Sequence, residues 1–138
     1  MSSLLPCMAD NSFILIADDD KSDRFLIRHA IEEGNFPLQI EEVADGEELI
    51  QFLDNNCKET VPRFILLDLN MPRKSGFEVL EYMKENPETC PVPVIVLSTS
   101  SSPYDISRAK ELGAKDYLIK PDDYKGYKEI VQKLNQYL

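Results

Sequence analysis

Residues 64–68, with the sequence FILLD, place four consecutive apolar side chains directly before an aspartate. An apolar run without alternation is typical of a strand in a parallel sheet that helices cover on both faces. The runs FILIA at 13–17 and VIVLS at 94–98 have the same character. We therefore expect parallel strands at Phe13–Ala17, Phe64–Leu67 and Val94–Leu97.

Two further runs are predicted to be strands, at Leu38–Val43 and Tyr117–Ile119. The first alternates and carries Glu41 and Glu42, which is typical of an edge strand. Helical patterns, such as the amphipathic stripe over residues 22–33, separate the runs. Five strand-then-helix units predict an α/β fold, a single doubly wound parallel sheet with helices on both faces.

The chain has 138 residues, and 25 acidic against 15 basic residues give a net charge of −10. This length suits one domain, expected over 12–138 after a flexible leader at 1–11, with no output domain. A strongly acidic chain repels phosphate backbones, so we expect no direct nucleic acid partner. No apolar run approaches the roughly 18 residues of a membrane span and no signal peptide is evident, so we expect no membrane association and a cytoplasmic location.

The cysteines, Cys7, Cys57 and Cys90, are widely spaced and form no paired motif. With one histidine in the chain, neither a disulfide framework nor a zinc site is expected.

Ligands of an open doubly wound sheet bind at the carboxyl ends of its strands. The polar residues expected there are Asp18, Asp19, Asp20, Asp68, Ser98, Thr99 and Lys120. Carboxylates held close together repel unless a cation joins them, and Mg²⁺ is favoured because no EF-hand spacing occurs. A carboxylate beside Mg²⁺ can attack phosphorus, and a lysine and a hydroxyl are suited to stabilise the phosphoryl oxygens.

Four motifs carry a family resemblance: ILIADDD at 14–20, LLDLNMPRKSG at 66–76, PVIVLSTS at 93–100 and DYLIKP at 116–121. Together they resemble the receiver domain of bacterial two-component response regulators, over nearly the whole chain. Residues 100–121 are also similar to the small stand-alone regulators associated with phytochrome kinases. The resemblance implies a flavodoxin-like (βα)5 receiver fold with strand order 2-1-3-4-5.

The resemblance also implies a metal site and a phosphoacceptor. Asp68 matches the phosphoacceptor. Mg²⁺, for which Mn²⁺ could substitute, would be held by Asp68, by Asp19 and by the main-chain oxygen of Asn70, with Asp18 acting through water.

Other matching positions surround the implied phosphoryl group. Ser98 and Lys120 match the hydroxyl and the lysine that contact it, and the bond between Lys120 and Pro121 is expected to be cis. Tyr117 matches the aromatic switch residue, although a simple strand aromatic is an equal interpretation. Thr99 stands where the family usually has a small residue, so we expect it to tune phosphotransfer or hydrolysis rates.

The implied function is a stand-alone phosphorylation switch. A sensor histidine kinase would phosphorylate Asp68, and the surface of the fourth helix, fifth strand and fifth helix would change. The readout would be another protein, a phosphotransfer partner or a second copy in a homodimer. Beyond its own phosphorylation and slow autodephosphorylation, the chain is not expected to be an enzyme.

Three alternatives stay open from the residues. A phosphatase of the haloacid dehalogenase type also forms an aspartyl phosphate, but it needs a DxD nucleophile after the first strand and usually a cap. A flavodoxin-like nucleotide or flavin binder needs a phosphate loop where this chain has ADDDKSD. A pseudo-receiver would bind proteins without becoming phosphorylated.

Overall fold

The computed structural model describes residues 12–36, 38–56, 61–88 and 91–138. They form a five-stranded parallel sheet in the order β2-β1-β3-β4-β5, which confirms the predicted fold class and strand order. The strands are β1 (Phe13–Ala17), β2 (Gln39–Val43), β3 (Ile65–Leu67), β4 (Val94–Ser98) and β5 (Asp116–Ile119). The predicted leader and Cys7, Cys57 and Cys90 lie outside the described residues.

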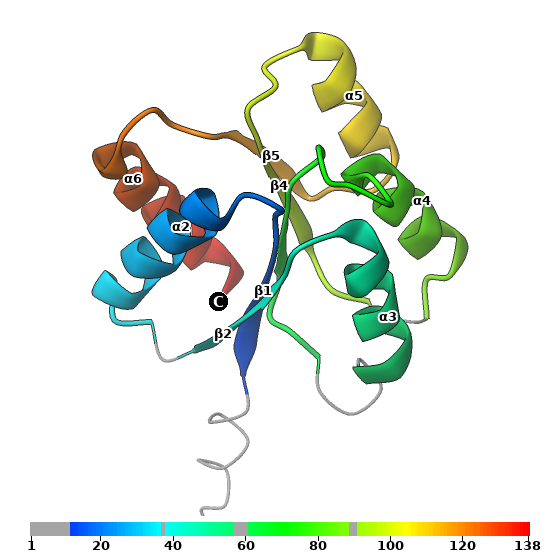
Figure 1. The fold of residues 1–138 in the computed structure, drawn as a ribbon, viewed down its shortest axis with the longest axis horizontal. Coiled ribbons are helices and arrows are strands. Elements are labelled where there is room, and N and C mark those ends of the chain that lie inside the picture. The colour runs from blue at the N-terminus through cyan, green and yellow to red at the C-terminus, as the bar shows by residue number, and fades with distance from the viewer. Residues whose placement is uncertain (1–11, 37, 57–60, 89–90) are drawn as a thin grey trace, which may run out of the picture.

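Helices cover both faces of this sheet, as Figure 1 shows. They are α2 (Lys21–Glu33), α3 (Gly46–Asn56), α4 (Gly76–Glu85), α5 (Pro103–Glu111) and α6 (Tyr124–Leu134), followed by the 3₁₀ turn η1 (Asn135–Tyr137). Helices α2 and α6 lie on one face, and α3, α4 and α5 lie on the other (Figure 1). In the described part of the chain, no helix is both long enough and apolar enough to cross a membrane.

The central strands are apolar throughout because each of their faces contacts a helix layer. Every residue of β1, β3 and β4 is buried, and alternate residues join the two separate cores on either side of the sheet. Strand β2 has Glu41 and Glu42 exposed, which confirms the predicted edge strand. Strand β2 is therefore one of the two edge strands, with β5 the other, and the carboxyl ends of β1, β3 and β4 lie side by side in the middle of the sheet.

Side-chain caps hold the helix starts next to the strand ends. Asp20 accepts a hydrogen bond from the Asp23 N–H at the start of α2, and Ser75 forms a capping box at α4. Ser102 caps α5, and such a cap contributes about 1 kcal/mol. Helix α6 ends at Leu134, and Leu138 beyond it is 38% exposed.

Candidate functional site

The carboxyl edge of the sheet gathers side chains from four strands. The parallel register pairs Leu67 of β3 with Ala17 of β1, so the residues that follow these two strands are neighbours. The Asp68 N–H donates to the main-chain oxygen of Ala17 at 2.9 Å, and the Lys120 N–H donates to that of Ser98 at 2.8 Å. The sheet itself therefore brings the predicted strand-end residues to one pocket.

Three carboxylates meet in this pocket. Asp18, Asp19 and Asp68 each offer an oxygen, and these oxygens all lie within 4.8 Å of one another. Asp18 and Asp68 are buried, whereas Asp19 is exposed. Burial, and next the charge of Asp18, raise the pKa of Asp68 to about 6, and burial also raises the pKa of Asp18. Carboxylate oxygens that repel one another at this distance are suitable ligands for a hard divalent cation such as Mg²⁺.

The segment after Asp68 is held close to its carboxylate. The Asn70 N–H donates to Asp68 Oδ1 at 3.3 Å, and the Asn70 side chain is exposed. The predicted metal contact of the Asn70 main-chain oxygen stays a prediction. Gly76 allows α4 to begin here, because a Cβ at this position would lie 2.5 Å from the main-chain oxygen of Asp68.

Lys120 supplies the positive charge of the pocket. Its Nζ lies 2.7 Å from Asp23 Oδ2, 2.9 Å from Asp18 Oδ2 and 3.6 Å from Asp68 Oδ2. Its side chain is only 7% exposed. Burial alone would lower the pKa of the ammonium, but hydrogen bonds to Asp23 and Asp18 outweigh this and raise the pKa above its ordinary value.

The hydroxyl side of the pocket connects to Tyr117. Ser98 is fully buried, and its Oγ accepts a hydrogen bond from the Ser100 N–H at 3.1 Å. The Tyr117 hydroxyl donates to the main-chain oxygen of Ser100 at 2.8 Å, so this side chain contacts the loop that follows β4. Thr99 is exposed between the two serines. The switch role of Tyr117 and the tuning role of Thr99 stay predictions.

The prediction of a cis bond between Lys120 and Pro121 is wrong for this structure, in which the bond is trans. The trans form of a bond to proline is favoured by about 0.5–1 kcal/mol unless its surroundings impose the cis form. Pro121 packs closely against Gly126, where a Cβ would lie 2.2 Å from the proline ring. Lys120 reaches the carboxylates from this trans backbone.

Asp23 is a pocket residue that the sequence analysis does not predict. It lies in the first turn of α2, where an acidic residue is an ordinary helix-start feature. The sequence indicates only that Asp23, three residues after the Asp20 cap, lies on the first turn of the helix. Its partner Lys120 is 97 residues away in the chain, so only the tertiary fold reveals their contact.

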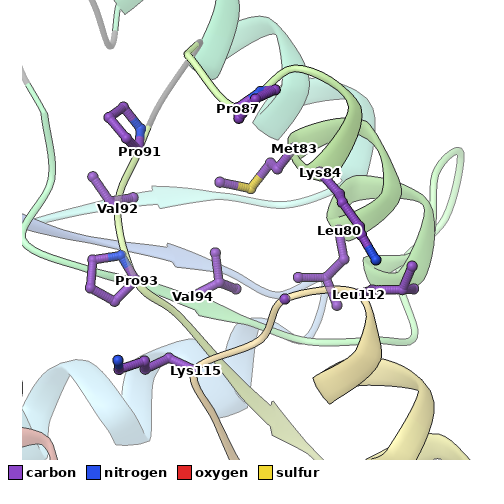
Figure 2. Close-up of a pocket in the computed structure, with 11 residues that line it drawn as sticks. Leu80, Met83, Lys84, Pro87, Pro91, Val92, Pro93, Val94, Leu112 and Lys115 are labelled. Atoms are coloured by element: carbon purple, nitrogen blue, oxygen red, sulfur yellow. The ribbon is translucent and has the colours of Figure 1, made fainter.

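A separate cavity of about 540 Å³ lies at the opposite edge of the sheet. Figure 2 shows Leu80 of α4, Val94 at the start of β4 and Leu112 after α5 around it. Among the described residues, its lining carries the charged side chains Lys84 and Lys115 and no carboxylate. This cavity therefore lacks the carboxylate cluster that the opposite end of the sheet carries.

Known proteins are similar to this chain in sequence. Residues 14–133 match the family described as the response regulator receiver domain. The "Probable methanogenesis regulatory protein FilR2" of Methanothrix harundinacea is 34% identical over 93% of this chain and 84% of its own length. The response regulator Rcp1 of Synechocystis sp. is 34% identical over 90% of this chain and 86% of its own length.

Two solved structures are similar to this one. The Mn²⁺-bound form of Rcp1 has a TM-score of 0.79 at 32% identity, covering 90% of this chain and 91% of its own. The phosphorylated cyanobacterial phytochrome response regulator RcpA has a TM-score of 0.80 at 33% identity with the same coverage. On the match across residues 14–133 and these relatives, the chain belongs to the response regulator receiver domain family of two-component signalling.

Proposed function

We propose that Asp68 accepts a phosphoryl group from the phosphohistidine of a sensor histidine kinase and that the chain acts as the resulting switch. The observation that carries this proposal is the cluster of Asp18, Asp19 and Asp68 oxygens within 4.8 Å, beside the ammonium of Lys120. This combination offers a nucleophile, ligands for a divalent cation and a positive charge at one place.

The transfer forms one bond and breaks another. An Asp68 oxygen bonds to phosphorus while the bond from phosphorus to the histidine nitrogen breaks, and the electron pair leaves with that nitrogen. The pKa of about 6 leaves Asp68 largely ionised near neutral pH, as a nucleophile requires. Lys120 and Ser98 would contact the transferred group. Mg²⁺ held by Asp19, Asp68 and the Asn70 main-chain oxygen, with Asp18 acting through water, would neutralise its charge.

Two similar structures support the metal and the modification. The Rcp1 structure holds Mn²⁺, and RcpA is phosphorylated. Mn²⁺ and Mg²⁺ both accept oxygen ligands, so either ion suits the carboxylates of this pocket. A histidine kinase partner would meet the chain in the cytoplasm, which is the location that the sequence predicts.

The switch would be read on the surface of α5, β5 and α6. The loop after β4 joins the pocket to this surface through Ser98, Ser100 and the Tyr117 hydroxyl. Tyr104 of α5 is 70% exposed and Ile119 of β5 is 41% exposed, so apolar area is available there to a protein partner or a second copy. Sedimentation with and without a phosphoryl mimic would test a homodimer.

The direct test is intact mass after incubation with Mg²⁺ and a small phosphodonor such as acetyl phosphate. We expect one added phosphoryl group, which is lost in Asp68→Asn and kept in Asp45→Asn, which changes an aspartate that follows strand β2 at the same end of the sheet. Phosphorylation that persists in Asp68→Asn would refute the assignment. Steady turnover of small phosphomonoesters would favour the phosphatase instead, and no phosphorylation at all would favour the pseudo-receiver.

A further inference from the structure

The Lys120 ammonium lies nearest to a carboxylate outside the predicted cluster. Its Nζ is 2.7 Å from Asp23 Oδ2, where it donates a hydrogen bond, but 3.6 Å from Asp68 Oδ2. The distance to Asp68 is beyond an ordinary hydrogen bond. The lysine thus stands beside the proposed phosphoacceptor without engaging it directly.

Asp23 is held in this position from three directions. Its own N–H is capped by Asp20 Oδ1 at 3.1 Å, which fixes the first turn of α2. One carboxylate oxygen faces Lys120, and the other lies 3.5 Å from the hydroxyl of Tyr127, which is buried in α6. Helices α2 and α6 lie side by side on this face of the sheet (Figure 1). The carboxylate is therefore oriented toward the lysine before any ligand arrives.

Removal of the Asp23 charge would leave Lys120 with two anionic partners. Asp18 already lies 2.9 Å away, so the remaining attraction pulls the ammonium toward Asp68. An ammonium in contact with Asp68 would compete with a divalent cation for the same carboxylate. It would also reduce the negative charge of the nucleophile before transfer.

We propose that Asp23 is a positioning residue that holds Lys120 away from Asp68 in the unphosphorylated protein. The Asp68 carboxylate then stays available to a divalent cation and to the phosphodonor, while the ammonium stays hydrogen-bonded to Asp23. This inference rests on the proposed function of Asp68 and Lys120, and it assigns a role to α2 in that site.

The test compares Mg²⁺ binding by calorimetry in the full chain and in matched variants. Asp23→Asn should raise the Mg²⁺ dissociation constant about tenfold relative to Asp20→Asn, a size usual for coupling between contacting charges. Asp20→Asn removes the same charge from the same turn and keeps a good helix cap. Asp23→Glu should restore most of the affinity, because it returns the charge near the lysine.

A second readout needs no metal. In the wild-type protein the buried Lys120 ammonium should exchange its hydrogens slowly enough to give a resolved nitrogen-15 correlation signal. Asp23→Asn should shift this signal, because the ammonium exchanges Asp23 for Asp68 as a partner, and an unshifted signal would contradict the proposal. Circular dichroism of each variant checks its folding. The comparison is then repeated in a protein that carries Lys120→Met. There Asp23→Asn and Asp20→Asn should lower the Mg²⁺ affinity equally, because the lysine that Asp23 positions is absent.

Equal effects of Asp23→Asn and Asp20→Asn on Mg²⁺ affinity would overturn this inference, as would an undiminished effect in the Lys120→Met chain. Either result is compatible with a wild-type protein that binds Mg²⁺ and is phosphorylated on Asp68, so it leaves the proposed function intact. A wild-type protein that shows neither property would remove the proposed function and this inference with it.

Discussion

Asp68→Asn should make the metal-free protein more stable at neutral pH. Asp68 is a buried carboxylate that lies beside the carboxylate of Asp18, and its closest cation, Lys120, is 3.6 Å away. Burial and the neighbouring charge disfavour its ionised form, so the folded protein carries an electrostatic cost at this position. An amide has nearly the same shape and carries no charge.

The magnitude follows from the pKa of Asp68. Burial, with the charge of Asp18, raises it from 3.8 to about 6, and each pKa unit corresponds to about 1.4 kcal/mol. Because the folded-state pKa is raised, the protonated carboxyl favours the fold fully below pH 3.8, and this contribution is lost as the pH rises through about 6. The attraction of Lys120 already opposes the rise in pKa, so the net cost of the ionised carboxylate is on the order of 3 kcal/mol. Because the amide must itself be desolvated in the pocket, we expect a net gain of about 2 kcal/mol.

Urea unfolding followed by circular dichroism, in buffer with a chelator, measures this gain. The chain has no tryptophan, so helix ellipticity is the suitable signal. We expect the stability difference between Asp68→Asn and wild type to be largest above about pH 7 and to shrink toward pH 4. Mg²⁺ at about ten times its dissociation constant should stabilise wild type by about 1.4 kcal/mol and narrow the difference.

Asp122→Asn is the matched control, because it removes one negative charge from an exposed position in the loop between β5 and α6. It should change stability by less than about 0.5 kcal/mol. An Asp68→Asn protein that is no more stable than wild type near neutral pH would refute the electrostatic argument. A gain that does not shrink in acid would trace the effect to something other than the ionisation of Asp68.

Three further changes test other parts of the pocket. Lys120→Met leaves Asp18 and Asp23 without their buried cation, so the free energy of unfolding without Mg²⁺ should fall by about 3 kcal/mol; urea titration checks this, and Mg²⁺ should restore much of the loss. Gly76→Ala would place a Cβ 2.5 Å from the Asp68 main-chain oxygen, so thermal unfolding should show a loss of about 2 kcal/mol, and an unchanged midpoint would contradict the close approach. Thr99→Ala should alter the rate of phosphorylation or of hydrolysis measured by intact mass, and two unchanged rates would exclude a tuning role.

The position of the main pocket residues could be predicted because a parallel sheet leaves little freedom. Once the apolar runs 13–17 and 64–67 are neighbouring strands, Asp18 and Asp68 must follow them at the same edge. The same reasoning applies to Ser98 and Lys120, which the structure brings to that edge. Residues that are far apart in the sequence therefore lie together because each follows a strand of the same parallel sheet.

Contacts that depend on side-chain direction could not be predicted in the same way. Asp23 has the sequence setting of a helix-start acid, and its contact with Lys120 depends on where a loop residue 97 positions later points. The bond before Pro121 is trans, and the two isomers of a bond to proline differ by only about 0.5–1 kcal/mol. Neither feature follows from apolar periodicity.

The pocket is the place where this sequence departs from the ordinary rule that buried charges are balanced. The carboxylates of Asp18, Asp23 and Asp68 lie within 3.6 Å of the Lys120 ammonium, and Asp19 lies beside Asp18 and Asp68, so negative charge is in excess there. A divalent cation removes most of that excess, and a phosphoryl group adds negative charge again. Binding of either one therefore favours binding of the other, since free-energy coupling between two ligands is reciprocal. The repulsion between these carboxylates destabilises the metal-free fold, and the same repulsion is what makes the site bind a divalent cation and respond to a phosphoryl group.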